Sequence, residues 1–213
     1  MRVGSWFSRL FHRRAVEPAP RAPTTPSPTT SPTQPRDTFE PSAPMTVSLG
    51  RVTGYSAAER AKLDQATRLI GNVLNSREFR DAVLGATFDG KPGFASETRS
   101  PQQVYAAIRA AKENFTSAAD GDVDLNVGLE SFSWFQRSTV GYTTPSSDTV
   151  TTNRRFFSGF TPAEVAGHLG HEWLHKLGFE HDFKATARRP SSVPYELGEL
   201  IETLAKGPLT PLS

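Results

Sequence analysis

Several stretches of the chain place apolar residues at the three- and four-residue spacing of an amphipathic helix. Ser56 and Glu59 form a capping box ahead of the first stripe, which consists of Leu63, Ala66, Leu69, Ile70, Val73 and Leu74. A short helix is expected after Ser76. Residues 100–103 open a third helix, whose inward-facing residues are Val104, Ile108, Ala111 and Phe115. These stripes are typical of a helical core.

In the middle of the chain the spacing changes from helical to alternating. Val123, Leu125 and Val127 alternate with Asp and Asn. Two further runs, 139–144 and 149–157, flank a Pro-Ser-Ser-Asp turn. We therefore predict a hairpin within a small mixed or mostly antiparallel sheet. Together the two patterns indicate an α+β fold.

The last long helix has the strongest start and stop signals. Thr161 is its expected N-cap, with Pro162 and Glu164 at the first and third helical positions. The helix should run to about Leu177, where Gly178 is free to take the left-handed conformation that ends it.

One side of this helix is apolar and the other carries histidines. The apolar stripe consists of Val165, Leu169, Trp173 and Leu177. Lys176 falls in the same sector, and we expect its ammonium group to reach outward to solvent.

Ahead of residue 45 the composition changes. Residues 18–44 hold nine of the 17 prolines, mixed with Thr and Ser, which predicts a disordered linker. Residues 1–17 are basic, and within them 1–14 have the spacing of an amphipathic helix that docks on a membrane surface or a protein. A frayed terminus is the alternative. The globular domain is predicted to span 45–213.

The charge distribution argues against nucleic acid as a partner. The formal net charge is +2, of which residues 1–44 contribute +3 and the remaining residues −1. No basic stripe with interleaved aromatic residues occurs in the predicted domain. The sequence also lacks a Sec signal and an apolar run of about 18 residues, the length needed to span a membrane. We therefore expect a cytoplasmic location or delivery by a non-Sec route.

The histidines indicate a metal site. The chain has no Cys, so a transition-metal site must use His, Asp or Glu. His171 and His175, four residues apart, project from one face of the last long helix. Gly178 lets the chain turn back so that His181 can supply a third nitrogen. Glu172 lies to one side, where it can reach a water on the ion without binding the ion.

Three protein ligands with an open fourth position are the arrangement of a catalytic zinc site. We therefore expect one zinc ion per chain. His168 lies one turn before His171 on the same side of the helix, and its expected role is to fill the wall of the cleft, because a fourth histidine ligand would close the open position.

At these residues the chain resembles the metzincin zinc peptidases, whose pattern is H-E-x-x-H-x-x-G-x-x-H followed by a Met-containing turn. The pattern is matched by His171, Glu172, His175, Gly178 and His181. The resemblance covers about residues 148–205. It implies a zincin-like domain in which 149–157 is an edge strand, followed by an active-site helix, a turn and a C-terminal helix.

The Met-containing turn is absent, because the only Met residues are Met1 and Met45. In its place stands Ser-Val-Pro-Tyr at 192–195, which is similar to the astacin turn with Pro194 at the Met position. That similarity implies that Tyr195 ligates zinc at rest or donates to the oxyanion. The alternative role for Tyr195 is a core residue that opens the final helix.

The resemblance implies a zinc metallopeptidase acting on peptide or protein substrates. Glu172 would take the proton of a zinc-activated water and pass it to the leaving amine, and an extended peptide would lie against the strand at 149–157. Three alternatives remain open. They are a zinc amidase or deacylase acting on cell wall or modified side chains, a non-catalytic metal-stabilised effector or virion module, and a site with Glu196 or Glu199 as the third ligand.

Overall fold

The computed structural model describes residues 43–89, 100–114, 119–136, 138–143, 147–184 and 186–212. The predicted basic segment 1–17 and the linker up to residue 42 lie outside these ranges. The described elements, in chain order, are β1 (Thr46–Thr53), α2 (Ala57–Leu74), α3 (Arg77–Gly85), α4 (Pro101–Ala110), β2 (Asp122–Glu130), η1 (Trp134–Gln136), β3 (Gly141–Tyr142), β4 (Thr149–Asn153), α5 (Arg154–Gly159), α6 (Pro162–Lys176), η2 (Arg189–Ser191) and α7 (Val193–Leu204). Helices and a small sheet in one chain confirm the α+β class.

The four strands form one mixed sheet in the order β1-β2-β4-β3. Strands β1, β2 and β4 are parallel, and only β3 is antiparallel, paired with β4 through Gly141 opposite Thr152. The predicted hairpin is therefore present. Of the two expected arrangements, the mixed sheet is confirmed and the mostly antiparallel one is wrong. The expectation that 149–157 is an edge strand is also wrong, because β4 lies between β2 and β3.

Strand β4 ends at Asn153 because that residue caps a helix. The Asn153 side chain accepts a hydrogen bond from the Arg155 N–H at 3.1 Å, and its amide donates to the Thr139 carbonyl at 3.0 Å. The phenylalanines that follow have helical spacing. Phe157 is buried in the core, and the Phe156 and Phe160 rings lie 6.3 Å apart.

Sequence periodicity missed strand β1, and its irregular register explains why. The pairing with β2 shifts between Leu49 and Val52, so the half-buried positions do not keep a strict alternation. At this shift Gly50 lies against β2, where a Cβ would come within 2.5 Å of the Asn126 side-chain oxygen. That oxygen accepts a hydrogen bond from the Arg51 N–H at 2.6 Å.

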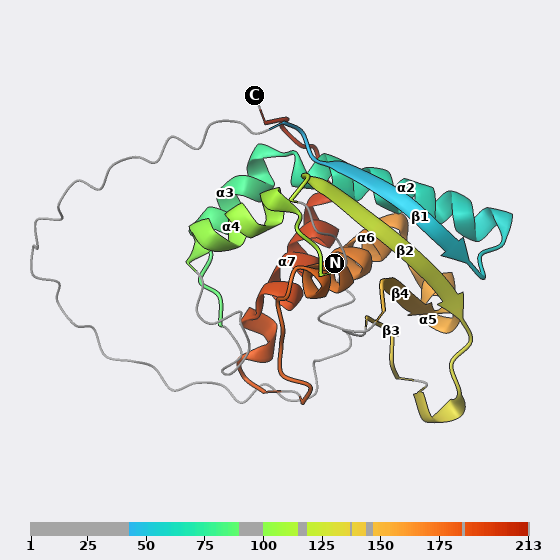
Figure 1. The fold of residues 1–213 in the computed structure, drawn as a ribbon. Helices are drawn as coiled ribbons and strands as arrows, with labels where there is room; N and C mark the ends of the chain where they lie inside the picture. Colours follow the sequence, from blue (N-terminus) through green and yellow to red (C-terminus); the bar gives the residue numbers. More distant parts are fainter. Residues whose placement is uncertain are drawn as a thin grey trace, which may run out of the picture.

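In the view of Figure 1, helices α2 and α6 lie behind strands β1 and β2, and α3 and α4 lie to one side of them. Helix α2 packs on β1, α6 packs on α2 and β4, and α7 packs along α6. Each predicted helix start in this part is confirmed, with capping boxes at Ser56, Ser100 and Thr161. Among the described residues, no helix is both long enough and apolar enough to cross a membrane.

A buried polar network joins α6 to β2. The expectation that Lys176 reaches solvent is wrong, because its side chain is buried and its Nζ donates to the Asp124 carbonyl at 2.7 Å. Glu113 is buried beside it and accepts hydrogen bonds from Trp173 Nε1 at 2.7 Å and the Asp124 N–H at 3.1 Å. Burial lowers the pKa of Lys176 and raises the pKa of Glu113, and the attraction between the two groups opposes the shift of the lysine.

Helices α6 and α7 approach closely because α6 carries glycine at two contact positions. A Cβ on Gly167 would lie 2.8 Å from both the Glu202 Cβ and the Gly198 carbonyl oxygen. A Cβ on Gly170 would lie 2.5 Å from the Ile201 Cδ1. This contact holds α7, and the turn that precedes it, against the histidine-bearing helix.

Replacing Gly167 with alanine should therefore lower the free energy of unfolding by about 1–3 kcal/mol, the usual cost of overpacking. The new methyl group meets backbone that cannot move without separating α6 from α7. Gly85→Ala is the matched control, since a Cβ at that helical position meets nothing within 4 Å and should be neutral or slightly stabilising. Thermal or urea unfolding of both variants measures the difference, and equal stabilities would contradict the close contact.

Candidate metal centre

The helix that carries the histidines begins and ends as its sequence predicts. The Thr161 hydroxyl accepts from the Glu164 N–H, and the Glu164 carboxylate accepts from the Thr161 N–H. The helix ends after Lys176, and Gly178 takes a φ of 84°. That left-handed residue reverses the chain, so that the segment after the helix returns along its last turn.

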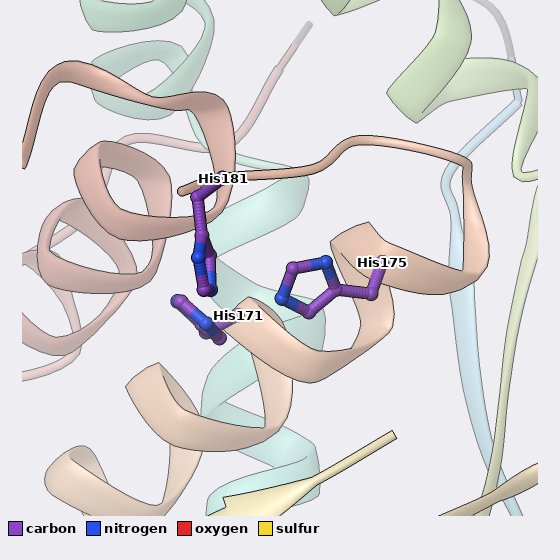
Figure 2. Close-up of side chains that lie close together, drawn as sticks. All are labelled: His171, His175 and His181. Atoms are coloured by element: carbon purple, nitrogen blue, oxygen red, sulfur yellow. The ribbon is translucent and has the colours of Figure 1, made fainter. Parts of the chain in front are cut away.

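This reversal brings three histidines together. Figure 2 shows the imidazoles of His171 and His175, from the helix, and of His181, from the returning segment, turned toward one another. One ligand nitrogen from each residue lies within 4.8 Å of the others. In the described part of the chain, no other group of three or more His or acidic residues is placed to hold an ion.

The hydrogen bonds of the three rings fix which nitrogen is available. Nδ1 of His171 lies 2.9 Å from the carbonyl oxygen of Pro194, and Nδ1 of His175 lies 2.8 Å from that of Phe179. Nδ1 of His181 lies 3.0 Å from the carbonyl of Asp182. A carbonyl oxygen can only accept, so each Nδ1 must carry the proton. Each neutral ring therefore presents the lone pair of its Nε2.

The rings of His171 and His175 are also held in the neutral form. Burial lowers the pKa of His171 well below its usual value and lowers that of His175 to about 4, and the neighbouring histidines add to both shifts. Neutral imidazole is the form that binds a transition metal. Three convergent imidazole nitrogens without a thiolate suit zinc, and they equally suit copper, iron and nickel.

Glu172 lies beside the cluster without belonging to it. Its carboxylate is buried, with Oε1 3.9 Å from Nδ1 of His168. Burial raises the pKa of Glu172 to about 7, and the nearby Thr143 opposes that rise. Thr143 directly follows β3, so the end of the edge strand lies against the carboxylate.

His168 is a buried packing residue beside Glu172. Its side chain is almost fully buried, and its Nε2 lies 3.0 Å from the Thr152 hydroxyl. Gly141 of β3 lies so close that a Cβ there would come within 2.6 Å of the His168 ring. The structure thus places His168 between α6 and the sheet, outside the group of three ligands.

Tyr195 stands next to two of the three histidines. It lies in the first turn of α7, and its ring centre is 4.7 Å from the ring centres of both His171 and His181. The Arg189 guanidinium lies over the Tyr195 ring, 4.7 Å from its centre. Burial raises the pKa of Tyr195 to about 12, so its hydroxyl keeps its proton at neutral pH.

The turn at 192–195 contributes a backbone carbonyl to the site. Pro194 supplies the carbonyl that orients His171, and Val193 is buried beside it. Glu196 and Glu199, which the sequence left open as a third ligand, are not part of the described histidine group. The carbonyls of Pro194, Phe179 and Asp182 were missed by sequence reasoning, since a backbone acceptor has no residue signature.

Comparison with known proteins finds no matching family model, curated protein or solved structure. The function must therefore be inferred from the residues of this site.

Proposed function

We propose that the chain is a zinc-dependent hydrolase, and specifically a metallopeptidase, with one zinc ion held by Nε2 of His171, His175 and His181. The observation that carries the proposal is the common tautomer of the three rings. Each Nδ1 is committed to a backbone carbonyl, so three nitrogen lone pairs are offered to one ion. When bound, zinc would lower the pKa of a water to about 7 and polarise the carbonyl of a substrate.

Glu172 is the proposed general base. A structural metal site needs no carboxylate beside it, and Glu172 is buried next to the histidines without being one of the ligands. A carboxylate in that position takes a proton from the attacking water at one of its Oε atoms and returns the proton to the leaving amine. Contact with Thr143 and packing near His168 keep the side chain in place.

The proposed substrate is an extended peptide that pairs with β3. Strand β3 is at the edge of the sheet, and in the described ranges no strand lies beyond it. A peptide added to this edge would pass Thr143, whose neighbour across the site is Glu172. The strand proposed to pair with the peptide is therefore β3, whereas the sequence resemblance implies the strand at 149–157, which contains β4.

Tyr195→Phe should lower kcat by about 10²–10³, the usual cost of losing one oxyanion donor. The phenol lies beside His171 and His181, and the substitution removes only its hydroxyl. Zinc content and melting temperature should stay at the parent values, because the ring and its packing are retained. Steady-state kinetics and metal analysis test this, and turnover within a few-fold of the parent would assign Tyr195 to packing.

The proposed function is tested by metal analysis and a cleavage profile of the full chain. We expect one zinc per chain and hydrolysis of peptide bonds in a mixture of quenched fluorescent peptides. A chelator should remove the activity, and added zinc should restore it. Incubation of the same protein with peptidoglycan distinguishes a cell-wall amidase from a peptidase. Cleavage of peptidoglycan alone, or a chain that binds no zinc, would contradict the proposal.

A further inference from the structure

The segment between β2 and β3 carries three aromatic residues, Phe132, Trp134 and Phe135, and β3 itself carries Tyr142. We call these four residues the aromatic platform. Trp134 is 67% exposed, Phe135 90% and Tyr142 39%. The rings of Phe132 and Tyr142 are in contact, with 5.6 Å between their centres. Phe132 also lines one hollow together with Trp134, and exposed aromatic residues that lie together in this way are typical of a binding site.

The platform is continuous with the strand that borders the candidate site. Tyr142 lies between Gly141, which packs on His168, and Thr143, which contacts Glu172. Successive side chains of a strand point to opposite faces of the sheet. The positions at Gly141 and Thr143 therefore face α6 and the histidines, and Tyr142 faces the opposite side, where it meets Phe132.

We propose that the aromatic platform binds large apolar side chains, aromatic ones above all, of an extended polypeptide substrate on the face of β3 opposite the metal centre. This inference rests on the proposed function and adds the substrate class. A peptide paired with β3 sends alternate side chains to the two faces. One set points to Glu172 and the histidines, and the other set lies opposite Tyr142 and continues toward Trp134.

A hollow beside the platform gives such a side chain room. It has a volume of about 600 Å³ and is lined by Phe132, Trp134, Ser131, Ser133, Asn153 and Arg155, among others. The neighbouring Arg154 is engaged by the Glu59 carboxylate and the Gly54 carbonyl. Most of the lining is polar or charged, and Phe132 and Trp134 are its aromatic part. An aromatic side chain would pack on these two rings, since ring pairs attract beyond their buried area.

The test is a binding measurement that does not depend on turnover. The full-length chain carrying Glu172→Gln is titrated with the capped peptide Phe-Thr-Phe-Thr-Phe and with the matched peptide Ser-Thr-Ser-Thr-Ser. We expect the Phe peptide to bind and to shift the emission of the exposed Trp134 to shorter wavelength. We expect the Ser peptide to bind at least about tenfold more weakly, as loss of several aromatic contacts predicts. Equal binding of the two peptides would overturn the inference.

Platform variants separate this surface from the rest of the site. The double variant Trp134→Ala, Phe135→Ala should bind a labelled Phe peptide with a Kd about tenfold higher than that of the parent. The conservative double variant Trp134→Phe, Phe135→Tyr should restore binding. In the active chain the alanine pair should raise KM for Phe-rich peptides and leave kcat unchanged. Both residues are exposed, so the melting temperature should stay the same. An unchanged Kd in the alanine pair would overturn the inference.

Two results distinguish this inference from the proposed function. If the parent chain cleaves no peptide but binds the Phe peptide through the platform, the hydrolase proposal fails and the platform remains a polypeptide-binding surface. If the chain cleaves Phe-rich and Ser-rich peptides equally well, the hydrolase proposal stands and the platform fails. A Trp134 shift with phosphatidylcholine–phosphatidylserine vesicles and none with the Phe peptide would overturn the inference in favour of a membrane surface.

Discussion

Replacing Glu172 with glutamine should reduce peptide hydrolysis by about 10²–10⁴, the contribution of a positioned general base, and should leave zinc bound. The amide keeps the size of the side chain, and it cannot take a proton from water. The proposed zinc ligands are untouched, because Glu172 lies outside the group formed by His171, His175 and His181. Single-turnover kinetics on a fluorogenic peptide, with metal analysis of the same sample, measure both parts of the prediction.

Glu196→Gln is the matched control for this variant. Glu196 is a half-buried carboxylate in the first turn of α7, next to Tyr195 but outside the histidine group. Its removal should change turnover by no more than a few-fold. Loss of zinc from Glu172→Gln would show that the carboxylate is a ligand. Turnover at the parent rate would assign the proton transfer to another group.

The sequence predicts local features of this chain well, because their signals lie within a few residues. The capping residues Ser56, Ser100 and Thr161 act on N–H groups three positions away, and the structure has each of them in place. Gly178 ends its helix for the same kind of reason, with a left-handed conformation that few other residues adopt readily. The three-histidine cluster follows from this local geometry.

The features that sequence reasoning missed depend on partners far along the chain. The sequence of its own helix predicts that Lys176 is a surface residue. In the folded chain its ammonium group donates to the Asp124 carbonyl of β2, a partner 52 residues away in the sequence. Strand β1 reads as irregular, because Gly50 accommodates Asn126 at a shift in register. The edge of the sheet was assigned to the wrong strand, since strand order is a property of the whole fold.

The candidate site also combines features that local spacing predicts with features that depend on distant parts of the chain. Spacing places His171, Glu172 and His175 on one helix, but the carbonyls that fix the ring tautomers come from the folded chain around them. Pro194 reaches His171 across 23 residues of sequence, on the turn that α7 holds in place. The close packing at Gly167 therefore has a role in orienting the first histidine, through the contact of α7 with α6.

His181→Ala should weaken zinc binding by more than about 100-fold. Even the loss of a group that only orients a metal ligand lowers metal affinity about 10- to 100-fold. His181 is the one ligand of the three that lies outside the helix, and its place depends on the reversal at Gly178. The variant keeps two nitrogens, which hold a transition metal far more weakly than three. Zinc affinity is measured by competition with a chromophoric chelator at fixed pH.

The same variant should lose stabilisation by zinc. A ligand present at 100 times its Kd stabilises the folded chain by about 2.7 kcal/mol, so the parent should melt at a clearly higher temperature with zinc than with chelator. His181→Ala should show little of this rise. His168→Gln is the control, because His168 is buried against Thr152 outside the ligand group, and the rise should persist there. Parent-like zinc affinity in His181→Ala would place the ion on other residues, and the proposed metal centre would then be wrong.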